Sequence, residues 1–267
     1  MGWTAQGVGT TYGFYGMYGF SDSDVWVTGN GGRAYHWDGS VWTEASTPAT
    51  TTLYGVWGAT PNDVWAVSAS GQIVNYDGTG WSSVTSNTTS GLNDVWGAAA
   101  DNVWAVGNGG TIMRYDGNSW SPVTPSPTTA DLYAIHGTGP NDVWVVGGNR
   151  TVLHWNGSVW EIRNATLGGW YFGVYAAGPD DVYAVGGTGY IIHWDGAGWT
   201  QVVSGLSATW YDVWVAPGGD LFVVGTNGMV GYYDGNVWQQ LDTHTSQTLR
   251  CVWGADPGSV WAAGLTG

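Results

Sequence analysis

The chain has 267 residues, with no lysine and five arginines against 20 acidic side chains, for a formal net charge of −15 at pH 7. This charge repels nucleic acid and anionic membrane surfaces, and the lack of lysine excludes Schiff-base chemistry. No apolar run approaches the roughly 20 residues of a membrane-spanning helix, so we expect neither nucleic-acid binding nor membrane insertion.

The composition also bears on where the protein works. The single cysteine, Cys251, has no partner for an internal disulfide, so cysteine usage does not indicate a redox compartment. The N-terminal residues 1–4 lack the basic and apolar regions of a signal peptide. The absence of lysine and the abundance of Thr, Ser, Asn and Gly favour an extracellular or cell-surface location, and this is our expectation.

A repeat of about 39 residues runs through the whole chain. One aromatic position recurs at steps of 39 or 40 residues, and the turn pattern Asp-Gly-x-x-Trp recurs in the same register. A period near 40 residues with four strand-sized segments per unit is typical of a propeller blade. We therefore predict one domain over residues 1–267. The recurring aromatic residues are Trp26, Trp65, Trp104, Trp144, Tyr183, Phe222 and Trp261.

Residues 53–84 show how one unit is built. Four apolar segments, at 53–57, 64–67, 72–76 and 81–84, are rich in β-branched and aromatic residues and lack helical periodicity. Turn residues separate them, and the last turn, Asp77-Gly78, is a strong hairpin signal. Four antiparallel strands per unit follow. Because their apolar residues lie on both faces, each sheet must pack between two others.

The seven units predict an all-β, seven-bladed β-propeller with four-stranded antiparallel blades. The last unit stops at Gly267, before the segment equivalent to residues 33–39, which is its third strand. Residues 3–8 match an outer strand, so we expect the N- and C-terminal segments to close the ring with an incomplete last blade. Three explanations of this gap stay open: a three-stranded blade, a chain cut from a longer array, or strand addition by another molecule that gives a homo-oligomer.

Two segments carry a resemblance to a known family. Residues 102–112 and the turn Asp116-Gly117-Asn118-Ser119-Trp120 resemble the bacterial propellers with Asp-box turns. These include the sialidase-like BNR repeats and the photosystem II assembly-factor propellers. The resemblance covers the whole chain and implies an architecture, not an activity. It also implies that the first turn residue is structural, and this residue is Asp38, Asp77, Asp116, Asn156, Asp195 or Asp234.

Residues that depart from the repeat are the candidates for function. Asp94, Asp212 and Arg250 replace aromatic or small residues in the first strand of their units. The innermost strands of a propeller line its central channel, so we take Asp94, His136 and Arg250 as channel residues. Such a polar cluster could bind a cation or small ligand, or could hold ordered water.

The links between units are the most variable segments, and we expect them to emerge on one face of the ring. Two of them end in additional aromatic residues. Aromatic faces beside hydroxyl and amide groups suit sugar rings, although these tryptophans could instead fill space between blades. The ligand-binding candidates are Trp170, Tyr171, Trp210, Tyr211, Asp212 and His244.

The sequence does not favour catalysis. Sialidase chemistry needs three convergent arginines, and the repeat does not bring three to one inner position. The histidines His36, His154 and His193 share one register, which indicates a structural role. We expect no enzyme, no cofactor and no metal.

We predict a lectin-like recognition module whose partner is a glycan or a cell-surface protein. One alternative is a structural or adhesive protein-interaction module that self-assembles through the incomplete blade. The other is a hydrolase or lyase acting in the channel.

Overall fold

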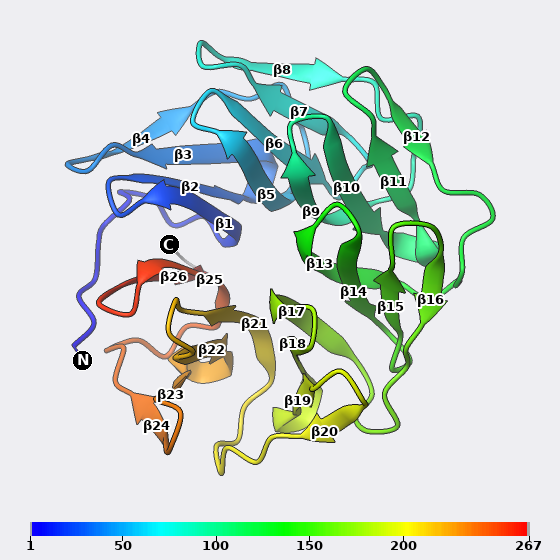
Figure 1. Cartoon of the computed structure of the whole chain (residues 1–267). Helices are drawn as coiled ribbons and strands as arrows, with labels where there is room; N and C mark the ends of the chain where they lie inside the picture. The colour runs from blue at the N-terminus through cyan, green and yellow to red at the C-terminus, as the bar shows by residue number, and fades with distance from the viewer. Residues whose placement is uncertain (1, 266–267) are drawn as a thin grey trace.

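The computed structural model describes residues 2–265, so Met1, Thr266 and Gly267 lie outside the described chain. Six four-stranded antiparallel sheets and one two-stranded sheet stand around a central channel (Figure 1). In each larger sheet the strands follow one another in chain order from the channel outward. The all-β propeller predicted from the repeat is therefore confirmed.

The strands of the first three blades have the following bounds. The first blade holds β1 (Phe14–Ser21), β2 (Asp24–Gly29), β3 (Arg33–Trp37) and β4 (Trp42–Ala45). The second holds β5 (Leu53–Thr60), β6 (Asp63–Ser68), β7 (Ile73–Tyr76) and β8 (Trp81–Val84). The third holds β9 (Leu92–Ala99), β10 (Asn102–Gly107), β11 (Ile112–Tyr115) and β12 (Trp120–Pro122).

The remaining strands continue the pattern. The fourth blade holds β13 (Leu132–Gly139), β14 (Asp142–Gly147), β15 (Val152–Trp155) and β16 (Trp160–Ile162). The fifth holds β17 (Tyr171–Gly178), β18 (Asp181–Gly186), β19 (Ile191–Trp194) and β20 (Trp199–Gln201). The sixth holds β21 (Trp210–Val215), β22 (Leu221–Gly225), β23 (Val230–Tyr233) and β24 (Trp238–Leu241), and the last sheet holds β25 (Leu249–Asp256) and β26 (Ser259–Gly264).

Four single-turn 3-10 helices connect second and third strands. They are η1 (Asn30–Gly32), η2 (Asn108–Gly110), η3 (Gly187–Gly189) and η4 (Thr226–Gly228). The middle residue of each has a positive φ, which is 68° at Gly31 and 63° at Gly109. The middle residue is a glycine in η1 and η2 but Thr188 in η3 and Asn227 in η4, whereas the last residue of all four is a glycine with positive φ, the conformation that glycine adopts without strain.

The prediction of seven four-stranded blades was wrong. Residues 2–265 form six, and the sheet that they form in the remaining position consists of β25 and β26 alone. The predicted outer strand at residues 3–8 does not form. This N-terminal segment and β26 line a common cavity of about 550 Å³, and the segment does not pair with β26 at the spacing of about 4.8 Å that a sheet needs.

Closure of the ring depends on β25, which packs between β21 and β1. The N-terminal segment contributes a side chain to this region even though it forms no strand. Trp3 packs against the hydrophobic cluster that contains Phe222 of the sixth blade and Val252 of β25. The N-terminal segment therefore meets the last sheet through side-chain packing and not through a shared four-stranded sheet.

Aromatic residues of the second strands form the contacts between blades. The Trp26 ring lies 5.0 Å from Tyr76 and 5.3 Å from Trp81 in the next blade. The same contacts recur in the following blades: Trp65 with Tyr115 and Trp120, Trp104 with Trp155 and Trp160, and Trp144 with Trp194 and Trp199. Most of the repeated tryptophans thus serve the core between sheets.

The inner strands of adjacent blades approach closely at the glycine that follows Tyr54. A Cβ atom on Gly55 would lie 2.7 Å from Asp94 Cα in the next inner strand. We therefore expect Gly55→Ala to lower the free energy of unfolding by about 1–3 kcal/mol, the usual cost of overpacking. Urea denaturation followed by tryptophan fluorescence measures this change.

Gly80→Ala is the matched control, because a Cβ atom there has no heavy atom within 4 Å. We expect its effect to stay within about 0.5 kcal/mol. Equal stability of the two variants would contradict the close approach of β5 and β9.

Candidate functional site

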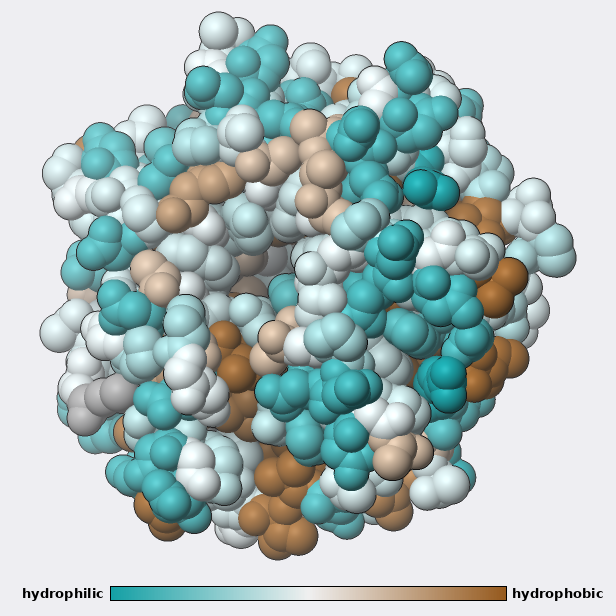
Figure 2. Space-filling model, viewed as in Figure 1, coloured by the Kyte–Doolittle hydropathy of each residue, from teal (hydrophilic) through white to brown (hydrophobic). Residues whose placement is uncertain are grey.

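A cavity of about 730 Å³ occupies the central channel, lined by residues of β1, β5, β9, β13, β17, β21 and β25. We call these the inner strands. Figure 2 shows the hollow at the centre of the face in view. A cavity of this volume suits a small molecule or one end of a longer chain.

One level of the channel is a ring of mostly aromatic side chains, which lies near the start of each inner strand, where the links enter. Neighbouring rings touch: the centroids are 5.3 Å apart for Tyr15 and Tyr54, and 5.4 Å apart for Phe172 and Tyr211. The guanidinium carbon of Arg250 lies 3.8 Å from the centroid of Tyr211. We call this level the mouth ring, and its members are Tyr15, Tyr54, Asn93, Tyr133, Phe172, Tyr211 and Arg250.

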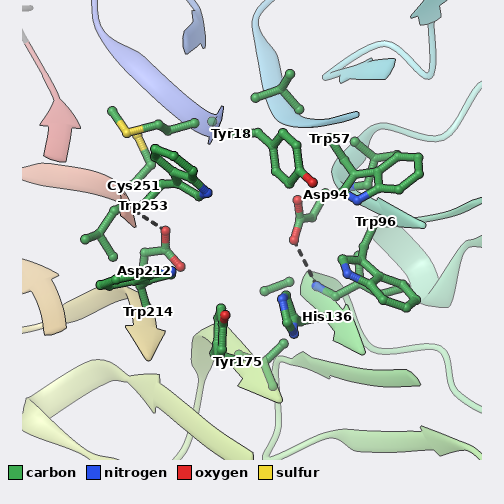
Figure 3. A pocket seen from close by; sticks show the side chains of 18 of the residues that line it. Tyr18, Trp57, Asp94, Trp96, His136, Tyr175, Asp212, Trp214, Cys251 and Trp253 are labelled. Carbon is green, nitrogen blue, oxygen red and sulfur yellow. Dashed lines mark hydrogen bonds between the residues drawn. The ribbon is translucent and has the colours of Figure 1, made fainter. Parts of the chain in front are cut away.

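Two carboxylates lie one residue further along the inner strands. Asp94 accepts the amide of Val95 at 2.8 Å and, through its other oxygen, the amide of Ile135 in β13 at 2.9 Å. Asp212 repeats this arrangement at the same distances, with the amides of Val213 and of Val252 in β25. Each carboxylate thus joins two inner strands. Figure 3 shows the two on opposite sides of the channel.

Burial raises the pKa of Asp94 and of Asp212 to about 7. The backbone hydrogen bonds act in the opposite direction because they favour the charged form, and the charge of Asp212 adds to the rise at Asp94. Within residues 2–265 no arginine or histidine forms an ion pair with either carboxylate. Both groups therefore exchange protons near neutral pH.

His136 and Cys251 are also held in uncharged forms. Burial lowers the pKa of His136 to about 4, and its Nδ1 accepts the amide of Ala176 in β17 at 3.1 Å. The imidazole also stacks on Tyr175, with centroids 4.1 Å apart. Burial raises the pKa of the Cys251 thiol well above its ordinary value. Neither group is poised as a base or nucleophile at neutral pH.

The predicted ligand-binding residues fall into different environments. Trp170 is 54% exposed and stacks on Tyr133 of the mouth ring, with centroids 6.1 Å apart. Tyr171 and Trp210 are fully buried, which leaves neither ring a free face for a ligand. His244 is exposed and pairs with Asp242 at 3.2 Å, and it lies beside the cavity at the N-terminal segment, away from the channel.

The structure thus brings together Tyr211, Asp212, Asp94, His136 and Arg250 in the channel, with Trp170 beside its mouth. Tyr133 and Phe172 belong to the same surface and were not among the predicted site residues. Their signal was present in the sequence, because both occupy the register of Tyr54. A residue that recurs with the repeat is expected to serve the fold, so the register alone does not single these two out.

The turn residues cap their own hairpins. Asp38 accepts the amides of Ser40 and Val41 at 2.9 Å, and the side chain and backbone donors of this turn lower its pKa to about 2. In each of the other five turns, the amides two and three residues further along donate to the capping side chain in the same way. These side chains are Asp77, Asp116, Asn156, Asp195 and Asp234. The side-chain oxygens of these turn residues are therefore engaged in hydrogen bonds with backbone amides.

Within the described chain no group of three or more His, Cys, Asp or Glu side chains is arranged to hold a metal ion. The same residues contain no helix long and apolar enough to span a membrane. The channel can offer a ligand aromatic surface and one guanidinium, whereas its carboxylates are engaged with backbone amides.

No family model matches this chain, and no curated protein matches its sequence. Solved structures match its fold. YCF48 bound to D1 peptide is 17% identical with a TM-score of 0.82, over 100% of this chain and 93% of that one. Virginiamycin B lyase from Staphylococcus aureus is 16% identical with a TM-score of 0.85, over 97% and 94% of the two chains.

The WD40 propeller domain of Doa1 is 12% identical with a TM-score of 0.80, over 96% and 91% of the two chains. At these identities the likeness shows the β-propeller fold alone.

The raised pKa values of Asp94 and Asp212 predict a pH dependence of stability. An acid whose folded pKa of about 7 exceeds its unfolded value of roughly 3.9 binds more protons when folded. The contribution of such a group to folding stability is full below about pH 4 and is lost as the pH rises through 7. We therefore expect the melting temperature of the Asp94→Asn, Asp212→Asn double variant to fall less between pH 5 and pH 8 than that of the unmodified protein.

The lowered pKa of His136 acts with the opposite sign in this window but is common to both proteins, so it cancels in the comparison. Asp22→Asn, at an exposed carboxylate outside the channel, controls for a general loss of charge. Identical pH profiles of the double variant and the unmodified protein would contradict the buried titration.

Proposed function

We propose that this chain is a non-catalytic recognition module that binds a glycan at the mouth of its channel. The observation that carries the proposal is the exposed ring of Trp170 at the end of a continuous arc of aromatic side chains. From Trp170 the contacts pass to Tyr133 and Phe172, and from Phe172 to Tyr211. Exposed, contiguous aromatic surface on a soluble scaffold is typical of a binding site.

Sugar rings fit this surface for a chemical reason. Their C–H faces stack on aromatic rings while their hydroxyl groups take hydrogen bonds from nearby polar side chains. Tyrosines make up most of the aromatic members of the mouth ring, and each combines a flat ring with a hydroxyl. The channel cavity of about 730 Å³ gives room for the first sugar units.

The polar channel groups favour binding over catalysis. Asp94 and Asp212 each accept two backbone amides, and the Nδ1 of His136 accepts the amide of Ala176. A general acid or base has to reach the reacting group instead. We place the module outside the cell or on its surface, in line with its composition.

A glycan array screened with tryptophan fluorescence tests this proposal. We expect Trp170→Ala to weaken the binding of any glycan hit about tenfold, as expected from the loss of roughly 1.5 kcal/mol of stacking. Trp170→Phe keeps an aromatic face and should recover most of the affinity.

Val159→Ala is the control, because Val159 is similarly exposed, at 56%, but lies on the turn between β15 and β16. Binding that survives Trp170→Ala unchanged would contradict the proposed site, and silence across the array would contradict the glycan function.

A second candidate function is protein interaction by strand addition, and one observation favours it. Within residues 2–265, β26 pairs with β25 alone, so its outer edge has no neighbouring strand. The adjacent cavity of about 550 Å³ is lined by Val260, Trp261 and Ala262 of β26. An open strand edge beside an apolar groove accepts an extended peptide. The YCF48 structure that matches this fold contains a bound peptide.

Analytical ultracentrifugation over a range of concentrations tests self-assembly through this edge. We expect the mean mass to rise with concentration, and a synthetic peptide of residues 33–39, which matches the strand that β26 lacks, to reverse the rise. A scrambled peptide is the control. A constant monomer mass at high concentration would contradict this candidate.

A further inference from the structure

We infer that Arg250 makes the channel mouth selective for sugars that carry a carboxylate. The inference rests on the proposed glycan function and narrows its ligand class. It follows from the position of this arginine in the repeat, its lack of a partner, and the geometry of its guanidinium.

The fold does not require an arginine at this position. The equivalent residues of the six complete blades are Tyr15, Tyr54, Asn93, Tyr133, Phe172 and Tyr211. All six blades form with a neutral side chain there, five of them aromatic. A cationic side chain at this position of the last sheet therefore departs from the structural pattern, and the departure lies in the channel cavity.

Arg250 differs from three of the other four arginines, whereas the exposed Arg114 packs on the rings of Trp104 and Trp155 and also has no ion pair among the described residues. Arg33 pairs with Glu44, Arg163 pairs with Glu161, and Arg150 donates from Nε to the carbonyl oxygen of Gly168. Among the described residues no carboxylate pairs with Arg250, and its buried Nε has no hydrogen-bond acceptor. A buried donor without an acceptor costs free energy, and an anion in the channel would supply acceptors to the Nη groups of Arg250, which have none among the described residues.

The geometry suits a carboxylate. The guanidinium lies 3.8 Å from the ring centroid of Tyr211 and 5.9 Å from that of Tyr15. Stacking on Tyr211 occupies a face of the planar group and leaves its edge, with the N–H groups, for hydrogen bonds. Two parallel N–H groups at such an edge match the two oxygens of a carboxylate.

The surroundings select a singly charged sugar. The net charge of −15 opposes polyanions such as nucleic acid or heavily sulfated chains. Asp94 and Asp212, one residue further along their strands, add to this opposition when ionised. The ring of Tyr211 lies against the guanidinium and in turn contacts the ring of Phe172, so a ligand here presents one carboxylate beside a stacking ring. A uronic acid has both.

Galacturonic acid and its methyl ester are matched probes, because esterification removes the single charge and keeps the sugar ring. Isothermal titration calorimetry measures both affinities. We expect the unmodified protein to bind the acid about ten- to a hundredfold more tightly than the ester, as expected for a charge-assisted hydrogen-bonded pair. Arg250→Gln should remove this preference, and Arg250→Lys should keep part of it.

Arg163→Gln is the matched control, since it makes the same change in net charge on the outer strands, where Arg163 pairs with Glu161. Melting temperatures of all variants check that each one folds. Equal loss of preference in Arg163→Gln and Arg250→Gln would assign the effect to net charge and overturn the inference.

The remaining outcomes separate this inference from the glycan proposal. Equal affinity of the unmodified protein for acid and ester, with binding still dependent on Trp170, would overturn acid selectivity and leave a neutral-glycan site. A preference for the acid that Arg250→Gln abolishes and Trp170→Ala leaves intact would support carboxylate binding by Arg250. It would contradict the proposed stacking of the sugar on Trp170. Binding of a short peptide through its C-terminal carboxylate, with no binding of either probe, would overturn both.

Discussion

The packing of second-strand aromatic rings against the next blade is the interaction on which this ring depends. Each sheet is apolar on both faces, and Trp26, Trp65, Trp104 and Trp144 fill the space to the following sheet. The contact persists at the closure, where Trp261 of β26 lies 5.6 Å from Trp37 and 5.8 Å from Trp42 of the first blade. A two-stranded sheet can close the ring because it retains this aromatic residue.

Sequence periodicity predicted the repeated strands and their turns well, because each blade meets the same neighbours and so needs the same residues. It failed at the closure. Register showed that residues 3–8 match an outer strand, but register carries no distance, and these residues line a cavity with β26 without pairing with it. Register likewise could not distinguish Trp170, which is exposed, from Trp210, which is buried, because exposure depends on how each link crosses the blade edge.

The candidate site was predictable where residues broke the repeat and invisible where they followed it. Asp94, Asp212 and Arg250 stood out as polar departures, and all three line the channel. Their chemistry was not readable from sequence, since the bonds of the two carboxylates to Ile135 and Val252 depend on how adjacent strands approach. Tyr133 and Phe172 conform to the repeat and act with their neighbours as one surface.

The bond between Asp212 and the Val252 amide has a consequence for the motions of the ring. In a circular array each sheet is held by its two neighbours, and the sheet with the fewest strands buries the least surface against them. The pair β25 and β26 is therefore the part of the ring expected to detach first in a local opening. The side chain of Asp212 joins β21 to β25 at that position through the Val252 amide. Because its pKa is about 7, the strength of this hydrogen bond changes with the protonation of Asp212 near neutral pH.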